Sequence, residues 1–334
     1  MFVGCDLHKK YSYVVTKDQH GNTIDSVKLY HADKTELKNF FSALPKDSQV
    51  ALESCSFNYW VGDLIESIGL PVKIAHTAKT KAIAEERIKT DKISAGVLAD
   101  LLRTNLLPEA YRAPHHVRDA RTLMRYRFHI LNVRTKMKNR IHALIDYNGI
   151  QQSFTDLFGK AGRQFLSQLI LPNPYRYIID QCLSVVDMMT TLVNHVDRML
   201  RRQIKDDPRA QLLTTIPGIG VITAHIILAE IGEISRFKNR HKLASYIGII
   251  PRIHQSGQIS YYGHITKSGN RYLRTAFVEA AQTAIRHDIY LKHAFNKIKA
   301  KKGYGVAIVA VAHKLVKSTY ALLTKQKPYQ YRAV

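Results

Sequence analysis

The chain of 334 residues has few cysteines and no long apolar run. Its three cysteines, Cys5, Cys55 and Cys182, are odd in number and widely spaced, which excludes a disulfide framework and a zinc knuckle and indicates a reducing compartment. No apolar run approaches the roughly 20 residues that a membrane-spanning helix needs. Residues 2–6 read as a strand and continue directly into the polar residues 8–10, so we expect no signal peptide.

Acidic residues are scarce as well. The sequence has 26 Asp and Glu against 50 Lys and Arg, which gives a formal net charge of +24. Such an excess indicates an anionic partner, and nucleic acid is a better candidate than a membrane surface. A hydrophobic fraction of 46% is ordinary for a globular protein, so the chain can form a sizeable core. Its length leaves room for two or three domains.

Residues 1–112 alternate short apolar runs with helical patterns. A hairpin-linked group of strands followed by alternating helices and strands predicts a mixed α/β sheet with helices on its faces. The predicted strands cover residues 2–5, 11–16, 23–30, 49–53 and 70–75, with a hairpin turn at 18–22. The predicted helices cover residues 35–44, 57–68, 79–89 and 93–105.

The rest of the chain is predicted to be mainly helical. Apolar residues spaced by three and four along 118–147 are typical of a long helix with a narrow apolar seam, close to a coiled coil. After a broken connector at 149–174, a second helix over 178–205 can return antiparallel. We therefore expect a coiled-coil middle region over 113–207. Residues 208–334 form the third expected domain, which ends in a long helix over 305–324.

Three carboxylates in the first domain are candidates for metal ligands. Asp6 and Glu53 each end an apolar run that reads as a strand, and Asp91 opens a predicted helix. Converging carboxylates hold the divalent ions used in phosphoryl transfer, and Mg²⁺ prefers oxygen ligands. We predict a Mg²⁺ (or Mn²⁺) site at these three residues, although an isolated acidic residue near a strand end is usually only solvated. His8 is expected either to touch a phosphate or to lie on a surface loop.

Two segments are predicted to bind phosphates. Residues 118–142 hold eight Lys and Arg against Asp119 alone, which favours a phosphate-binding helix over a solvated helix face. Residues 216–224 read as helix, Gly-x-Gly turn and helix, in which freed N–H groups can hold phosphates unless the segment is a plain helical hairpin. The residues predicted to bind nucleic acid are Arg118, Arg121, Arg125, Arg134, Lys138, Gly218, Gly220, Arg252, Lys267, Arg271 and Arg274.

Ser256 is the candidate nucleophile. It stands beside Gly257 in a segment predicted to be an exposed loop, and the four basic residues of 252–274 named above are expected to surround it. A hydroxyl in that setting can reach a phosphate whose charge the cations offset. Taken alone, a Ser-Gly pair is more often turn chemistry, and Tyr261 and Tyr262 are rival nucleophiles.

The segments around Asp6, Glu53 and Asp91, together with residues 216–273, resemble the DEDD-type insertion-sequence transposases. These are recombinases guided by a structured bridge RNA and related to Piv-type DNA invertases, and the resemblance spans nearly the whole chain. It implies a RuvC-like RNase H fold over 1–112 and a coiled-coil region over 113–207. It also implies a C-terminal transposase domain with a helix-hairpin-helix over 208–334.

The resemblance further implies an enzyme that cuts and rejoins DNA. Ser256 would be the nucleophile and form a transient phosphoserine link, with the acidic cluster binding Mg²⁺ beside it and the two sites supplied by different subunits. The implied partners are double-stranded donor and target DNA, a structured guide RNA, and further copies of the chain in a dimer or an active tetramer, without a membrane. The implied setting is the cytoplasm of a bacterium or archaeon, at the nucleoid.

Ser94 departs from the family pattern, which has Asp-x-x-Asp after Thr90. Asp91 is followed three residues later by Ser94, and Asp100 would lie about 180° from Asp91 at roughly 100° per residue. Ser94 can ligate a metal through water, three carboxylates can suffice, or activity is lost. Two alternatives therefore stay open: a metal-dependent junction-resolving nuclease of RuvC type that uses water, and a non-catalytic nucleic-acid-binding relative.

Overall fold

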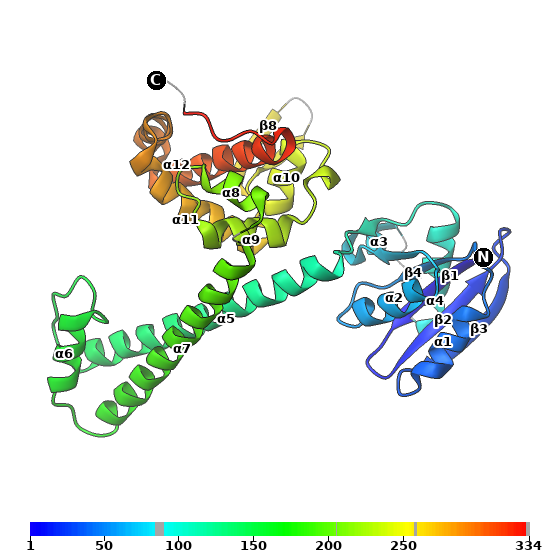
Figure 1. The fold of residues 1–334 in the computed structure, drawn as a ribbon, viewed down its shortest axis with the longest axis horizontal. Coiled ribbons are helices and arrows are strands. Elements are labelled where there is room, and N and C mark those ends of the chain that lie inside the picture. The colour runs from blue at the N-terminus through cyan, green and yellow to red at the C-terminus, as the bar shows by residue number, and fades with distance from the viewer. Residues whose placement is uncertain (84–89, 205, 257–258, 332–334) are drawn as a thin grey trace. The chain divides into compact units, whose positions relative to one another are not determined.

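The computed structural model describes residues 1–83, 90–204, 206–256 and 259–331 (Figure 1). For residues 204, 253–256, 259–260 and 262 it describes the backbone alone. The chain divides into two compact units, Met1–Ala113 and Pro114–Val334, which are considered separately below. The finer division into three domains stays a prediction.

The first unit is built on a mixed six-stranded sheet in the order β3-β2-β1-β4-β5-β6, which confirms the predicted α/β class. The central strand β1 (Phe2–Leu7) pairs antiparallel with β2 (Tyr11–Lys17) and parallel with β4 (Gln49–Leu52). All five predicted strands are present within two residues at their ends, and only the short β6 was not predicted. The outer strands are β3 (Thr23–Tyr30), β5 (Val72–Ala75) and β6 (Glu109–Ala110).

Helices cover both faces of this sheet. Side chains of α1 (Lys34–Ser42) and α2 (Asn58–Ser67) share one buried cluster with Val3 and Cys5 of β1. The opposite face of β1 is covered by α4 (Asp91–Arg103). The short α3 (Thr77–Ile83) completes the described helices of this unit, and the rest of the helix predicted over 79–89 lies outside the described residues.

Gly4 allows α4 to lie directly on β1. A Cβ atom at Gly4 would stand only 2.0 Å from the carbonyl oxygen of Ala95 and 2.6 Å from the backbone nitrogen of Ala99. Both alanines are fully buried, so small residues line the contact from the helix side as well. Gly4 and Asp6 are two residues apart on a strand and face the same side. The helix that packs on Gly4 therefore also lies over the side from which Asp6 projects.

The second unit begins with two long helices, α5 (His115–Tyr147) and α7 (Tyr175–Ile204), which pack against each other (Figure 1). Both were predicted within three residues of their ends. Between them lies α6 (Lys160–Gln168), which was not predicted. Apolar residues on α6, including Phe165 and Leu166, pack against the end of α5 and the start of α7.

The remainder of the second unit is a helical body with one hairpin. Its central helices share a single buried core, in which α12 contributes the largest number of side chains. Within α12 the backbone breaks at Gly303, with φ of 79°, so the predicted helix over 305–324 is its second segment. The elements are α8 (Pro208–Thr214), α9 (Val221–Ile231), α10 (Arg240–Ile247), β7 (Pro251–Ser256), β8 (Ile259–Ile265), α11 (Arg271–His287) and α12 (Ile289–Lys325).

By length and composition, α12 is the one described helix that could cross a membrane, with a mean hydropathy of 1.5 in its most apolar stretch. The sequence expectation concerned an uninterrupted apolar run, and α12 carries Lys314 and Lys317 among its apolar residues. Half of the stretch is buried inside the unit, where Val311, Leu315 and Val316 belong to the core. A core helix can be equally long and apolar, and the packing of α12 accounts for its apolar side chains.

Gly4→Ala should destabilise the protein by about 1–3 kcal/mol, the usual cost of forcing extra atoms into a packed core. The new methyl group would strike the backbone of α4. Denaturant unfolding followed by circular dichroism measures the effect. Gly96→Ala on α4, the helix that packs on Gly4, is the control, because nothing lies within 4 Å of its added Cβ. This control should stabilise by up to about 1 kcal/mol, and equal stability of Gly4→Ala and wild type would contradict the steric argument.

Candidate metal centre and nucleic-acid-binding residues

Asp6, His8 and Asp91 come together beside the end of β1. One ligand atom of each lies within 4.8 Å of the other two. His8 Nε2 is 3.5 Å from Asp6 Oδ2 and 3.3 Å from Asp91 Oδ1. Two of the three predicted carboxylates therefore converge. His8 joins them, although the sequence suggested only a phosphate contact or a surface loop for it. The spacing of Asp6 and His8, two residues apart on an extended segment, is the signal that could have found it.

This group of three residues suits a divalent cation. The Nε2 atom of His8 is buried and has no hydrogen-bond partner, although two carboxylates face it. Asp6 is also buried, at 7% exposure, and a buried carboxylate is stabilised by a nearby positive charge. Carboxylate oxygens and an imidazole nitrogen are ordinary ligands for Mg²⁺, Mn²⁺ and related ions. A bound cation would satisfy the histidine nitrogen and offset the repulsion between the two carboxylates.

Tyr11 and the start of α4 hold Asp91 in place. The Tyr11 hydroxyl donates to Asp91 Oδ2 at 2.9 Å, and its ring lies 4.8 Å from that of His8. The hydrogen bond to Asp91 is the main cause that raises the pKa of Tyr11. Asp91 is the first residue of α4, after Thr90, whose hydroxyl caps the helix. A negative side chain interacts favourably with the helix dipole at this position.

Glu53 lies on the neighbouring strand but outside this group. It directly follows β4, and its N–H donates to the carbonyl of Cys5 at 3.1 Å, which keeps its backbone level with Asp6. Its carboxylate is not among the ligand atoms that lie within 4.8 Å of one another. The described geometry therefore gathers Asp6, His8 and Asp91, with Glu53 beside them rather than among them.

Asp100 does not replace the missing fourth carboxylate. It forms ion pairs with Lys17 and Arg103, and Lys17 is level with Phe2, at the opposite end of β1 from the site. Asp91 and Asp100 both contact side chains of β2, so Asp100 is kept from the site by its position further along α4 rather than by the rotation expected from the sequence. Ser94 is half-buried and follows Asp91 by three residues, so both residues share a face of α4.

Ser256 is the last residue of β7 and is paired with Ile259 of β8. The sequence predicted a loop here, and the structure corrects this to a strand hairpin. The side chain of Ser256, the residues 257–258 and the side chain of Tyr262 lie outside the description, whereas Tyr261 is 68% exposed. Of the basic residues expected around Ser256, Arg274 donates to the carbonyl of Ile247 at 2.9 Å.

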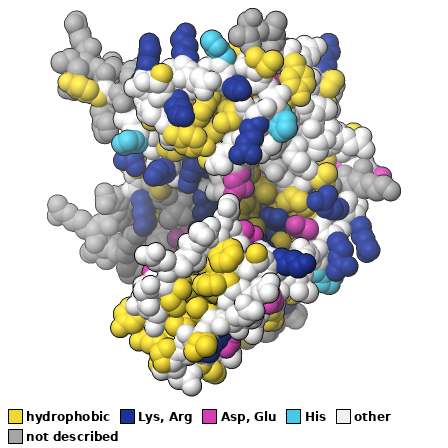
Figure 2. All heavy atoms as spheres, turned by 90° about the vertical axis from the view of Figure 1, so that its left-hand side faces the viewer, with side chains coloured by type: hydrophobic (Ala, Val, Ile, Leu, Met, Phe, Trp, Pro, Cys, Tyr) yellow, Lys and Arg dark blue, Asp and Glu magenta, His cyan; other side chains and the backbone are white. Residues whose placement is uncertain are grey.

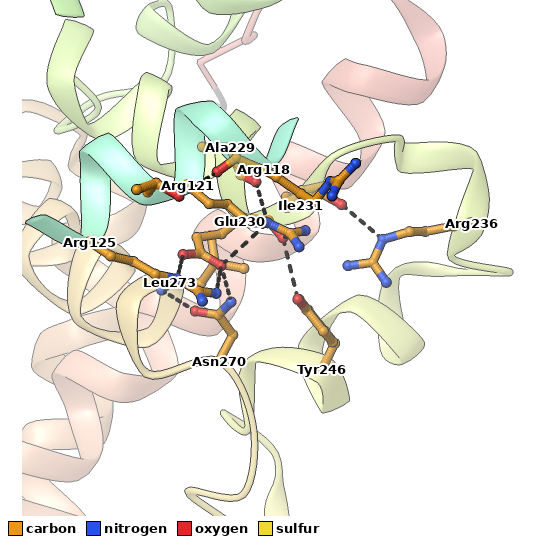
Figure 3. Close-up of polar contacts among 11 residues, drawn as sticks. Arg118, Arg121, Arg125, Ala229, Glu230, Ile231, Arg236, Tyr246, Asn270 and Leu273 are labelled. Carbon is orange, nitrogen blue, oxygen red and sulfur yellow. Dashed lines mark hydrogen bonds and ion pairs between the residues drawn. The ribbon is translucent and has the colours of Figure 1, made fainter. Parts of the chain in front are cut away.

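Two of the arginines predicted to bind nucleic acid contact a buried carboxylate, Glu230 of α9 (Figure 3). Arg125 donates to both of its oxygens, at 2.8 and 2.9 Å, and this bond raises the pKa of Arg125. Asn270, which caps α11, donates to Glu230 Oε2 at 2.7 Å. Arg121 donates to the carbonyls of Ala229 and Glu230 at 2.8 and 3.0 Å. This network ties α5 to α9 and to the start of α11.

Other basic residues of α5 also have partners within the unit. Arg127 Nη2 lies 3.1 Å from Asp197 Oδ2 and joins α5 to α7. Arg134 reaches the Thr190 hydroxyl at 3.5 Å, and Lys138 Nζ lies 4.5 Å from the centre of the Phe158 ring. The structure thus gives contacts within this unit for Arg121, Arg125, Arg134 and Lys138. Nucleic-acid binding by these four residues and by Arg118 stays a prediction.

The two glycines between α8 and α9 have different surroundings. Gly218 has φ of 83°, and a Cβ there would lie 2.1 Å from the carbonyl oxygen of Ala280 in α11. Glycine is therefore required by backbone conformation and by close packing. Gly220 precedes α9 as its N-cap and has open space around it. Phosphate binding by both residues stays a prediction, and the packing role of Gly218 is explained without it.

Residues 3–148 match the family DEDD_Tnp_IS110, described as "Transposase", and residues 210–296 match the "Transposase IS116/IS110/IS902 family". The chain belongs to the IS110-type transposases. Both candidate sites fall within these matches, since the first contains the Asp6, His8 and Asp91 group and the second contains Ser256.

Individual relatives agree with this assignment. A probable family 20 transposase of Pseudomonas aeruginosa is 24% identical, over 98% of each chain. The transposase for insertion sequence element IS1111A of Coxiella burnetii is 25% identical, over 98% of this chain and 91% of its own. The pilin gene-inverting protein of Moraxella bovis is 34% identical over 149 residues, or 44% of this chain and 46% of that protein. The resemblance to insertion-sequence transposases and Piv-type invertases is confirmed.

Mn²⁺ should bind at the Asp6, His8 and Asp91 group. Asp6→Asn, His8→Gln and Asp91→Asn should each lower the Mn²⁺ affinity at least about tenfold. Removing a residue that only hydrogen-bonds to a metal ligand already lowers metal affinity about 10–100-fold. Calorimetric titration of the full chain measures this. Ser94→Asp should tighten binding by adding a carboxylate on the same helix face. Asp100→Asn is the control, since Asp100 pairs with Lys17. Unchanged affinity in all three ligand variants would place the ion elsewhere.

Glu230→Gln should destabilise the protein by about 1–3 kcal/mol, because a neutral amide replaces the buried carboxylate that accepts from Arg125 and Asn270. Asp180→Asn removes a comparable partner from an exposed pair with Arg176, where the aspartate side chain is 53% exposed. That control should cost less than about 1 kcal/mol. Denaturant unfolding measures the loss in free energy of unfolding of each variant. Equal losses would show that the burial of Glu230 does not make its contacts more stabilising.

Proposed function

We propose that the chain is an RNA-guided transposase that cuts and rejoins DNA through a phosphoserine at Ser256, assisted by a metal-binding acidic cluster. Membership of the IS110-type transposases supports the overall activity. The observation that carries the metal-assisted part is the convergence of Asp6 and Asp91 on a buried nitrogen of His8, which faces both carboxylates without a hydrogen bond. The names of the relatives, transposases and a pilin gene-inverting protein, suggest DNA as the substrate.

For residues 1–112 we propose a RuvC-like RNase H fold. The mixed sheet with acidic residues on the adjacent strands β1 and β4, crossed by a helix bearing Asp91, supports it. Asp6, His8 and Asp91 would hold Mg²⁺ or Mn²⁺, with Glu53 as the neighbouring carboxylate. When bound, such an ion polarises a phosphate and stabilises the oxygens that attack and leave it.

For the C-terminal region we propose a transposase domain with a helix-hairpin-helix at α8 and α9 and the nucleophile on the β7–β8 hairpin. The Ser256 hydroxyl loses its proton as its oxygen attacks a DNA phosphate, the new bond to phosphorus forms as the bond to the leaving strand breaks, and the leaving oxygen takes up a proton in exchange. A DNA hydroxyl then attacks the same phosphorus and releases the serine. The ester retains the energy of the broken linkage, so rejoining needs no ATP. Exposed side chains on the hairpin, such as Arg252 and Tyr261, support access to DNA.

We propose a guide RNA on the basic face of α5 and self-association through the end of the long helices. Lys136 and Arg140 are exposed on α5 and available to phosphates. Figure 2 shows hydrophobic side chains gathered on the lower part of the face, where the α6 end of the long helices points to the viewer. Tyr147, Ile170 and Tyr177 there are 74%, 95% and 63% exposed. Exposed apolar patches of this kind are typical of protein interfaces, which supports a dimer or tetramer.

A hydrolytic nuclease is the second candidate. A metal bound by Asp6, His8 and Asp91 could activate water as the attacking nucleophile, and hydrolysis of this kind does not require Ser256. Such an enzyme would leave free DNA ends. Serine in place of the fourth aspartate at position 94 favours the third candidate, a relative that binds nucleic acid without cutting it.

Ser256 should become covalently joined to DNA. Protein, guide RNA and a nicked target that stalls rejoining are incubated, denatured and separated by gel electrophoresis. The wild-type chain should give a protein–DNA adduct and Ser256→Ala none, whereas Tyr261→Phe and Tyr262→Phe should retain it. Asp6→Ala, Glu53→Ala and Asp91→Ala should each abolish recombination. Free cut ends without an adduct would indicate the nuclease, and no cleavage at all would indicate the non-catalytic relative.

RNA that co-purifies with the full chain from its host should be a discrete noncoding species from the flanks of the element. Lys136→Gln with Arg140→Gln should flatten the dependence of log affinity on log salt, by about 0.9 for each lost phosphate contact on a duplex. Arg201→Gln with Arg202→Gln is the matched control at the exposed end of α7. Equal slopes for the two double variants would remove α5 from the RNA-binding surface.

A further inference from the structure

A groove of about 690 Å³ opens near the C-terminal end of the described chain. After α12 the backbone turns at Gln326, with φ of 53°, and the following segment runs back beside the helix (Figure 1). The groove lies between this segment, α12 and the start of α10. Its charged and aromatic lining consists of Arg240, Tyr290, Lys314, Lys317, Lys325, Lys327, Tyr329 and Tyr331.

Hydrogen bonds hold the segment that forms one wall. The Tyr329 N–H donates to the Thr215 hydroxyl at 2.9 Å. The Tyr329 hydroxyl donates to Asp288 Oδ2 at 2.7 Å, and Asp288 is only 2% exposed. The ring of Tyr331 lies edge-on to that of Tyr329, with centroids 5.4 Å apart. Through Tyr329 the wall is therefore bonded to two residues of the body of the unit, Thr215 and Asp288.

The lining is positive and contains no acidic residue. Five lysines and arginines line the groove, and none of the five forms an ion pair with a carboxylate within the described part of the chain. Lys314 instead donates to the Tyr290 hydroxyl at 3.1 Å. Beside the groove, burial and then the charges of Lys317, His241 and Lys314 lower the pKa of His313. Cations gathered in a concave surface without counter-charges attract an anion.

The tyrosines narrow the class of anion. Tyr331 is 65% exposed, and Tyr290 is half-buried against Lys314. Aromatic rings beside a basic groove are typical of sites for single strands, because an unpaired base can stack on a ring whereas paired bases are already stacked. Pockets of about 300–1,000 Å³ accept ligands of small-molecule size, so this groove has room for about one or two nucleotides of a strand.

We propose that this groove binds an unpaired segment of a nucleic-acid strand. Lys314, Lys317 and Lys325 would contact its phosphates, and the tyrosine rings would stack on its bases. None of the lining residues belongs to the Asp6, His8 and Asp91 group or to the β7–β8 hairpin. The site would thus hold a strand independently of the serine chemistry, and the same chemistry would accept an opened DNA strand or an unpaired part of an RNA.

Fluorescence anisotropy of the full chain with labelled oligo(dT), oligo(rU) and a duplex of equal length tests the proposal. Lys317→Gln with Lys325→Gln should weaken single-strand binding at least tenfold and reduce the salt slope by about 0.7 for each lost contact. Lys297→Gln with Lys301→Gln removes two exposed charges from the same helix outside the groove, and should cost no more than twofold. Tighter binding of oligo(dT) would assign the strand to DNA, and tighter binding of oligo(rU) to RNA.

The tyrosines give a second, site-specific readout. Tyr331→Leu should lower single-strand affinity at least fivefold, whereas Tyr331→Phe should retain it because the ring remains. Photocrosslinking with a thiothymidine oligonucleotide, followed by peptide mapping, should locate the strand at Tyr290, Tyr329 or Tyr331. Equal losses in the two lysine double variants, or crosslinks confined to other segments, would overturn the proposal. Circular dichroism of each variant confirms that affinity losses do not come from unfolding.

Discussion

The candidate metal centre depends on one steric constraint, the direct contact between Gly4 and α4. Because position 4 has no side chain, the carbonyl oxygen of Ala95 can come close to the strand. A Cβ atom at position 4 would lie only 2.0 Å from that oxygen. The helix then lies flat on the central strand, and its first residue, Asp91, reaches the side from which Asp6 projects. Any larger residue would lift the helix and separate two carboxylates that only packing brings together.

In the second unit, a buried carboxylate and its hydrogen-bond partners hold the helices together. Glu230 can remain in the core because Arg125 and Asn270 satisfy both of its oxygens. A buried carboxylate without such partners would be strongly destabilising. The bonds fix α5 against α9 and fix the start of α11, the helix that follows β8. Part of the large positive charge thus serves the interior of the fold, and the surface available to nucleic acid is smaller than the sequence alone indicates.

Local patterns were sufficient for most elements. The apolar runs of the first unit and the three-and-four spacing over 118–147 gave strands and helices near their observed positions. The misses have physical causes. The short α6 is stabilised by contacts with the ends of α5 and α7 rather than by its own pattern. The polar stretch around Ser256 and Gly257 reads as a loop, and cross-strand pairing, which is not visible in local spacing, makes it a hairpin.

The sequence by itself determined the α/β character of the first unit, the excess of positive charge, the carboxylates at positions 6 and 91 and the family motifs. These properties depend on residue type and on spacing along the chain. Only the tertiary structure decided that His8 joins the two carboxylates, that Glu53 stands beside them, and that Arg121 and Arg125 contact the Glu230 region. It also decided that basic residues and tyrosines from α10, α12 and the segment after α12 line one groove. Such convergence depends on how helices pack, and packing is set by side-chain volume and buried charge summed over residues far apart in the chain.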